Sequence, residues 1–337
     1  MRLIAKNVLK IKAAGIIAFL LLCVLCAIYY NPSTHFPSPT GATDYIREPD
    51  ALYSYMTEGF SIGRTDSNGF NNFGQMAENS NSPDVLFMGS SHIEAMYVSQ
   101  KQNAPYILNE LLKPQEIKVY NIAMSAHNFM YCMNNLDVAL ASYKPQRYVV
   151  IETMSITFAV EEMEKLLAGN FPKGASVTKA DWKYWVQQPP YIKLMYNQYR
   201  NVLKEMKKVE QTIKPVRDEA KYRELLEKTI VHLSETVLSH NIEPILFFHP
   251  TLKIQPDGSA VTTYDKEDIA LLSQICAEQN VKFIDMTDIF TSAYINDYVL
   301  PHGFANTEIG TGHMNQHGQR MVAEALYNAI TQGGTTV

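Results

Sequence analysis

The sequence predicts an α/β protein with a five-stranded, mostly parallel sheet, preceded by one membrane-spanning helix. Short apolar runs alternate with helix-like segments five times after residue 83, a pattern typical of βα units. An uncharged apolar run covers residues 13–30. The composition, 46% hydrophobic and 19% charged, is that of a globular chain, which excludes a collagen-like or mostly disordered protein.

The N-terminal run has the length and flanks of a membrane anchor. The flanking residues are Arg2, Lys6, Lys10 and Lys12 before the run, and Pro32, Pro37 and Pro39 after it. As a helix the run spans roughly 27 Å, close to the bilayer hydrocarbon thickness, and basic residues favour the cytoplasmic side. We expect residues 1–30 to form a single-pass signal anchor with the remainder outside the cytoplasm. A cleaved signal peptide or a buried core helix are the alternatives.

Charge and cysteine content exclude two classes of protein. The chain carries 29 basic and 34 acidic residues, a net charge of -5, so it lacks the basic surplus that binds phosphates, and we expect no nucleic-acid partner. Four cysteines are too few for a disulfide scaffold. Cys132 and Cys276 lie in apolar stretches and are expected to be buried thiols.

Residues 31–82 are polar and rich in turn formers, and we interpret them as a linker and loop-rich lead-in. Residues 83–331 are expected to form one α/β domain with a helical insertion at about 159–214. The expected strands are 85–88, 117–122, 148–151, 244–248 and 281–284, and the expected helices are 103–112, 128–141, 215–239, 264–279 and a final helix that reaches Ile330. Ligands of such sheets bind beyond the carboxyl ends of the strands.

Two segments carry groups suited to catalysis. Gly89-Ser90-Ser91-His92 follows the first strand, and His313-Met314-Asn315-Gln316-His317-Gly318 precedes the last helix. With Asn121-Ile122-Ala123-Met124-Ser125-Ala126 after the second strand, these blocks resemble, in order and position, the motifs of the SGNH (GDSL-type) hydrolase superfamily. The resemblance covers residues 83–331 and implies a three-layer αβα, flavodoxin-like fold.

The resemblance also implies roles for individual residues. Ser91 is the nucleophile and His313 its general base, because a serine hydroxyl attacks only when an imidazole takes its proton. The backbone N–H groups of Ser91 and Ala126 form the oxyanion hole, although the family usually has glycine where this chain has Ala126. Acyl-transfer chemistry of this kind requires no organic cofactor and no metal.

The chain departs from the family in two places. The family's acid lies three residues before the histidine, where this chain has Gly310, and the family's asparagine after the third strand is missing. Glu308 or Asp297 could supply the acid, or a backbone carbonyl could orient His313 in a Ser–His dyad. Loss of activity is the third interpretation, because an unoriented imidazole can lower the rate about 10⁴-fold in the serine-protease precedent.

The other histidines have weaker signals. His92 and His249 follow strands one and four and are candidates for substrate contact, with a structural hydrogen bond as the alternative for His92. His313 and His317 are four residues apart, as in a zincin helix, but the glutamate of that motif is missing and Gly318 interrupts it. We therefore expect no metal site.

The chain looks most like membrane-anchored SGNH-like proteins that accompany bacterial cell-envelope polysaccharide systems, which assist D-alanylation or O-acetylation. That resemblance implies an extracytoplasmic serine esterase or O-acyltransferase at the bacterial cell membrane, acting on an acyl ester of a cell-envelope glycan. Its partners would be the acylated polysaccharide and a membrane-bound O-acyltransferase. A catalytically inactive protein that binds the glycan or the acyltransferase is the alternative. A nucleotide binder lacks support, since no Gly-rich phosphate motif follows any strand.

Overall fold

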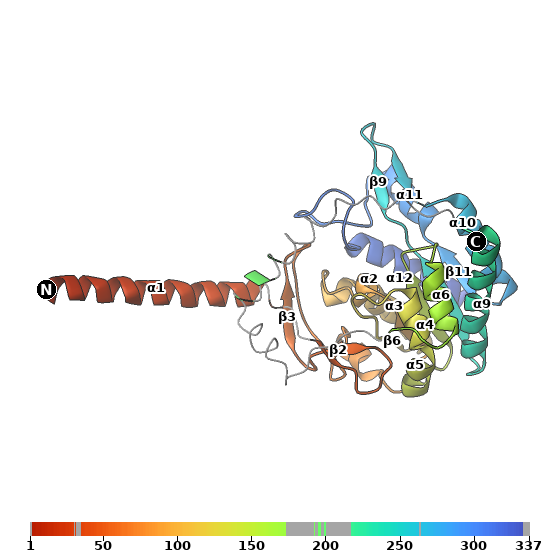
Figure 1. Ribbon diagram of the computed structural model, residues 1–337, viewed down its shortest axis with the longest axis horizontal. Helices are drawn as coiled ribbons and strands as arrows, with labels where there is room; N and C mark the ends of the chain where they lie inside the picture. The colour runs from red at the N-terminus through yellow and green to blue at the C-terminus, as the bar shows by residue number, and fades with distance from the viewer. Residues whose placement is uncertain are drawn as a thin grey trace.

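We describe the protein from a computed structural model, which covers residues 2–29, 31, 35–172, 192, 195, 196, 199, 217–262 and 264–332. A long N-terminal helix, α1 (Arg2–Tyr29), leads to a body of strands and helices (Figure 1). Most of the expected insertion at 159–214 lies outside the described residues. The described part of it begins with α6 (Val160–Leu167).

Most of the side chains described for helix α1 are exposed to solvent. Its segment Asn7–Cys26 has a mean hydropathy of 2.4, long and apolar enough to cross a membrane, and this is the one such helix among the described residues. Large side chains such as Leu9, Ile11 and Leu21 are more than half exposed. These observations fit an anchor or a signal peptide.

The central sheet has five parallel strands in the order β11-β8-β7-β5-β6. The strands are β5 (Val85–Met88), β6 (Val119–Asn121), β7 (Tyr148–Thr153), β8 (Glu243–Phe248) and β11 (Lys282–Asp285). Because β6 and β7 flank the first strand on opposite sides, the direction of winding reverses at β5. In such doubly wound sheets the reversal opens a crevice at the carboxyl end of the strand, which here is the position of Ser90 and Ser91. The predicted α/β fold is confirmed.

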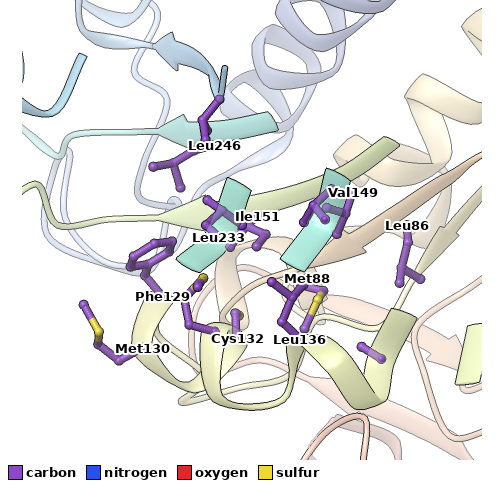
Figure 2. Close-up of a cluster of buried hydrophobic side chains, with 14 of the residues drawn as sticks. Leu86, Met88, Phe129, Met130, Cys132, Leu136, Val149, Ile151, Leu233 and Leu246 are labelled. Atoms are coloured by element: carbon purple, nitrogen blue, oxygen red, sulfur yellow. The ribbon is translucent and has the colours of Figure 1, made fainter. Parts of the chain in front are cut away.

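Helices cover both faces of the sheet, which gives the three predicted layers. One face carries α4 (Phe129–Asn134), α5 (Leu136–Tyr143), α6, α9 (Glu219–Leu238) and α10 (Lys266–Glu278); the other carries α3 (Ala104–Leu112), α11 (Thr287–Asp297) and α12 (Gln316–Thr331). Successive side chains of a strand point to opposite faces, so Leu86 and Met88 join the first core while Val85 and Phe87 join the second. Figure 2 shows the first core, where Leu233 of α9 packs near Ile151 and Leu246.

Two helices differ from the sequence-based expectation. The expected helix at 128–141 is two helices, α4 and α5, which meet at Asn135. Helix α11 was not expected, because its apolar residues form no clear stripe: Phe290 is its one fully buried side chain.

Short elements fill the lead-in and the loops. They are β1 (His35–Pro37), β2 (Tyr45–Arg47), β3 (Leu52–Tyr55), β4 (Ser61–Arg64), β9 (Leu252–Ile254), β10 (Ala260–Thr262) and the 3₁₀ turns η1 (Gly74–Glu78), η2 (Gln100–Gln102) and η3 (Lys113–Gln115). Strands β3 and β4 form an antiparallel hairpin. Asn31, just after α1, exchanges two backbone hydrogen bonds with Ser54 of β3, of 3.0 and 3.1 Å. The end of α1 is therefore attached to this hairpin.

We expect Leu233→Ala to lower the free energy of unfolding by about 2–5 kcal/mol, since it opens a cavity in the first core. Leu233 is 0% exposed, whereas Leu238 on the same helix is 42% exposed. Leu238→Ala is therefore the matched control and should cost about 0.5 kcal/mol or less. Denaturant unfolding of the two variants measures the difference, and equal losses would contradict the assigned core.

Candidate active site

The turn after β5 presents Ser91 at the start of a one-turn helix, α2 (Ser91–Glu94). Ser90 caps this helix with its side chain, which accepts a hydrogen bond of 3.2 Å from the His92 amide. Gly89 is required on steric grounds, because a Cβ there would lie 2.6 Å from Oε2 of Glu152. Ser90 also donates its hydroxyl proton to Oε1 of Glu152 over 2.9 Å. The turn that carries Ser91 is thus fixed to the end of β7.

His313 lies in a loop that is held just before α12. Asn315 caps that helix: its Oδ1 accepts from the amides of His317 and Gly318 at 2.9 and 3.2 Å. The Nδ2 of the same side chain donates to the carbonyls of Leu300 and Gly303 at 2.8 and 3.0 Å. One half-buried amide thereby ties both sides of the loop together, which limits the positions open to His313.

Ser91, His313 and Glu58 form a continuous hydrogen-bonded chain. His313 Nε2 lies 2.8 Å from Ser91 Oγ, and its Nδ1 lies 2.8 Å from Glu58 Oε2. The same carboxylate oxygen accepts the His313 amide N–H at 2.7 Å. The ring of Tyr97 stacks on the imidazole with centroids 4.0 Å apart. This is the spacing of a nucleophile, a base and an orienting acid.

Electrostatics favour a charged Glu58. Burial works to raise the pKa of Glu58, but the hydrogen bond and charge of the His313 ring and the His313 amide lower it overall. A carboxylate at Nδ1 keeps the proton there, so Nε2 offers its lone pair to the Ser91 hydroxyl. Burial also raises the pKa of Tyr97, so the ring that stacks on His313 stays neutral.

The structure places Glu58 beside His313, and neither of the two acids that the sequence offered as candidates. Glu308 and Asp297 are both exposed, and neither has a described contact with His313, whose two ring nitrogens are taken by Ser91 and Glu58. Glu58 comes from the turn of the β3–β4 hairpin, in the lead-in that we interpreted as linker and loop. It fits beside the loop because Gly312 has no side chain: a Cβ there would lie 2.5 Å from Glu58 Oε2.

The two candidate oxyanion donors lie at the ends of neighbouring strands. The N–H groups of Ser91 and Ala126 have no acceptor among the described residues, which leaves them free for a substrate oxygen. Ala126 has φ +66°, the left-handed conformation that glycine adopts at no steric cost and that costs other residues roughly 1–2 kcal/mol. The chain holds an alanine in the backbone conformation for which the family uses glycine.

A buried ion pair fixes the backbone before Ala126. Arg47 Nε donates to Glu94 Oε1 over 2.6 Å, and Glu94 Oε2 accepts the Ser125 amide at 3.0 Å. Arg47 also donates to Ser125 Oγ at 3.0 Å. Although burial opposes it, pairing with Glu94 raises the pKa of Arg47, which therefore stays charged. The tyrosine hydroxyl of Tyr45 donates to the Ser125 carbonyl as well.

His92 and His249 are not where substrate contact would place them. His249 is 0% exposed and His92 5%, so neither ring forms an open wall of the site. His249 Nε2 lies 2.7 Å from Glu152 Oε1, and the Met314 amide donates to His92 Nδ1 at 3.2 Å. Burial, and then neighbouring imidazoles, lower the pKa of His92 well below its usual value. Both rings serve the interior beneath the site rather than its surface.

No protein-family model matches the chain, and no curated protein matches it. Among solved structures it is similar to TesA (12% identity, 74% of this chain and 98% of that chain, TM-score 0.39). It is also similar to the acetyl xylan esterase AlAXEase (14% identity, 73% of this chain and 98% of that chain, TM-score 0.40). A third similar structure is the two-domain esterase CEX, active on acetylated mannans (11% identity, 77% of this chain and 51% of that chain, TM-score 0.42).

The strand order and the positions of the three motifs define where the candidate site lies in the fold. The chain has a doubly wound α/β fold with a five-stranded parallel sheet. Its serine turn follows the first strand, its second block follows the neighbouring strand, and its histidine loop precedes the last helix.

We expect Glu58→Gln to lower kcat/KM on an activated ester by roughly 100- to 10,000-fold, because an amide no longer fixes the tautomer or balances the charge of His313. Glu308→Gln and Asp297→Asn should leave the rate unchanged. The measurement is the rate of p-nitrophenyl acetate hydrolysis by the native chain and by each of the three variants. A rate that falls in a control but not in Glu58→Gln would contradict the assignment of Glu58.

Gly312→Ala should lower the same rate by roughly 100-fold, since the added Cβ displaces the carboxylate and misplacement by about 1 Å has that effect. Gly258 is the matched control: its φ is +83°, close to the +89° of Gly312, but nothing lies within 4 Å of its Cβ position. Gly258→Ala should cost about 1 kcal/mol of stability and no activity. Kinetics together with thermal melting separate the two effects.

Proposed function

We propose that the chain is a membrane-anchored serine esterase or O-acyltransferase of the SGNH type, which acts on an acyl ester of a cell-envelope glycan. The hydrogen-bonded chain from Ser91 through His313 to Glu58 is the observation that carries the proposal. A structural role alone would not require a carboxylate on one ring nitrogen and a serine hydroxyl on the other. Ser91 and His313 are also only partly buried, so a substrate can reach them.

In the acylation half-reaction Ser91 Oγ attacks the carbonyl carbon of the ester while His313 Nε2 takes the hydroxyl proton. Glu58 stabilises the imidazolium that forms, through the bond to Nδ1. The carbonyl oxygen becomes an oxyanion and is bound by the N–H groups of Ser91 and Ala126, each worth roughly 3 kcal/mol in comparable sites. Collapse of the intermediate breaks the ester C–O bond, and His313 returns the proton to the leaving hydroxyl.

The acyl group then rests on Ser91. A second hydroxyl approaches, gives its proton to His313 Nε2 and attacks the acyl carbon, after which Ser91 leaves with the proton restored. If the second hydroxyl belongs to water, the reaction is ester hydrolysis. If it belongs to a sugar, the reaction is acyl transfer. The acyl group and the acceptor are left open by the proposal.

The surface beside the acid suits a glycan. A hollow of about 780 Å³ borders the Glu58 turn and the histidine loop, and its lining includes Phe60, Tyr298 and Phe304. Phe60 and Tyr298 are 53% and 81% exposed, and exposed aromatic rings offer wide contact with little loss of conformational freedom. A hollow of about 770 Å³ at the amino ends of the strands contains none of the candidate catalytic groups.

Attachment to a membrane would place this site near the bilayer. Asn31, two residues beyond α1, is hydrogen-bonded to Ser54, and Glu58 lies only four positions after Ser54, at most about 14 Å of chain. Figure 1 shows β3 beside the end of α1. We propose that α1 anchors the chain in the bacterial cell membrane, with the site on the outer side. A membrane-bound O-acyltransferase that delivers the acyl group is the partner this location suggests.

A fluorophosphonate probe tests the proposal directly, because it phosphonylates only an activated serine. The full chain in detergent should be labelled, and mass spectrometry of the labelled peptide should assign the adduct to Ser91 rather than Ser90. Labelling should disappear in Ser91→Ala and persist in Ser259→Ala, which changes an exposed loop serine. A folded chain that takes up no probe would favour the alternative, an inactive glycan- or acyltransferase-binding protein.

A further inference from the structure

Three buried histidines, His92, His249 and His302, meet directly beneath the candidate active site, and we call them the three-histidine cluster. One ring nitrogen from each lies within 4.8 Å of the others. The ring centroids of His92 are 4.9 Å from His249 and 5.6 Å from His302, and those of His249 and His302 are 5.6 Å apart. The three rings are at most 5% exposed. Neither the proposed reaction nor the sequence motifs assign them a common role.

The cluster holds lone pairs that nothing in the described chain satisfies. His249 Nε2 lies 2.7 Å from Glu152 Oε1, and its Nδ1 is buried without a described partner. Both ring nitrogens of His302 are buried without a described partner. Buried polar atoms in native proteins almost always have a partner, and leaving one unpaired costs roughly 1–3 kcal/mol. Three such atoms in one cluster indicate a missing ligand.

We propose that the three-histidine cluster binds one divalent transition-metal ion, with zinc as the expected ion. Neutral imidazole nitrogens are preferred zinc ligands at Zn–N distances of about 2.0–2.1 Å. Three rings around a tetrahedral zinc ion have centroids about 5 Å apart at that bond length, close to the separations observed here. A water molecule would complete the shell. From the sequence we expected no metal site, because His313 and His317 were the only histidines whose spacing along the chain resembles a metal-binding motif.

The surroundings of the cluster support ligation. A ligating histidine normally donates its second N–H to a carboxylate or carbonyl, which fixes the tautomer, and Glu152 does this for His249. His302 would lose no described hydrogen bond on ligation, since both of its nitrogens are without a described partner. In His92 the Nδ1 accepts the Met314 amide over 3.2 Å, and ligation through Nδ1 would replace that long bond.

The proposed ion would join three segments that carry the candidate active site. His92 belongs to α2, next to Ser91; His249 directly follows β8; and His302 lies in the loop that leads to His313. The isolated β-bridge between His302 and Met314 already pairs this loop with the residue after His313. A metal at the cluster would therefore hold the nucleophile turn and the histidine loop together from below, without touching the reacting atoms.

The test uses the full chain in detergent, purified without a polyhistidine tag and stripped with a chelator. Calorimetric titration with Zn²⁺, and with Co²⁺ followed by its visible absorption, should show one site per chain with a dissociation constant in the micromolar range or below. Bound Zn²⁺ should also raise the melting temperature, because an ion that binds only the folded state stabilises it. A folded native chain that takes up no Zn²⁺ overturns the proposal.

Variants locate the site. His302→Phe keeps a ring of similar volume and should weaken Zn²⁺ binding at least about 100-fold, while Glu152→Gln should weaken it about 10- to 100-fold by loosening His249. The exposed histidines His317 and His240, changed to Phe, are the matched controls and should bind as the native chain does. Undiminished binding in His302→Phe, or loss of binding in His317→Phe, overturns the proposal. Should His302→Phe fail to fold, the titration of Glu152→Gln decides in its place.

Discussion

The hydrogen bond between His313 Nε2 and Ser91 Oγ is the contact on which the candidate active site depends, and it joins residues 222 positions apart. Its geometry rests on Gln319, a fully buried side chain in the first turns of α12. Gln319 Oε1 accepts the Ala104 amide at 2.8 Å, and its Nε2 donates to the His92 carbonyl at 2.6 Å. The helix that follows His313 is thus bonded to α3 and to the turn that carries Ser91. The side-chain amide of Gln319 therefore links the segment that carries His313 to the segment that carries Ser91.

The sheet could be predicted because its strands are buried on both faces and therefore appear as continuous apolar runs. Ser91 and His313 could be located because each lies at a fixed place in that pattern, after the first strand and before the last helix. Glu58 could not be found in the same way. It lies 255 positions from His313, in a hairpin whose strands of four residues leave no periodic signal. The one hint was negative: Gly310 stands where the family has its acid, and glycine recurs at 312, where a side chain would exclude the carboxylate.

The lead-in contributes a second charged group, and the energetics of its ion pair explain what it does. Arg47 and Glu94 are 6% and 1% exposed at their side chains, and burying such a pair costs desolvation energy that often cancels the attraction. The ion pair therefore contributes little to the free energy of unfolding, and its main effect is to fix the position of the backbone at Ser125. Glu94 and Arg47 both bond to Ser125, and Ser125 precedes the residue at φ +66°. These bonds to Ser125 hold Ala126 in its left-handed backbone conformation. They also orient the Ala126 N–H, which has no described acceptor, toward the candidate oxyanion site.

The β3–β4 hairpin connects these features to α1. Asn31 is bonded to the middle of β3, and Glu58 lies in the turn that follows β3, so the orienting acid and the end of α1 share one short element. Asn306 Oδ1 accepts the Gly59 amide at 2.6 Å, and its Nδ2 donates to the Met56 carbonyl at 2.9 Å, which fixes the same turn to the histidine loop. The turn that carries Glu58 is therefore held on one side by the loop that leads to His313, and it continues on the other side into the strand that pairs with Asn31.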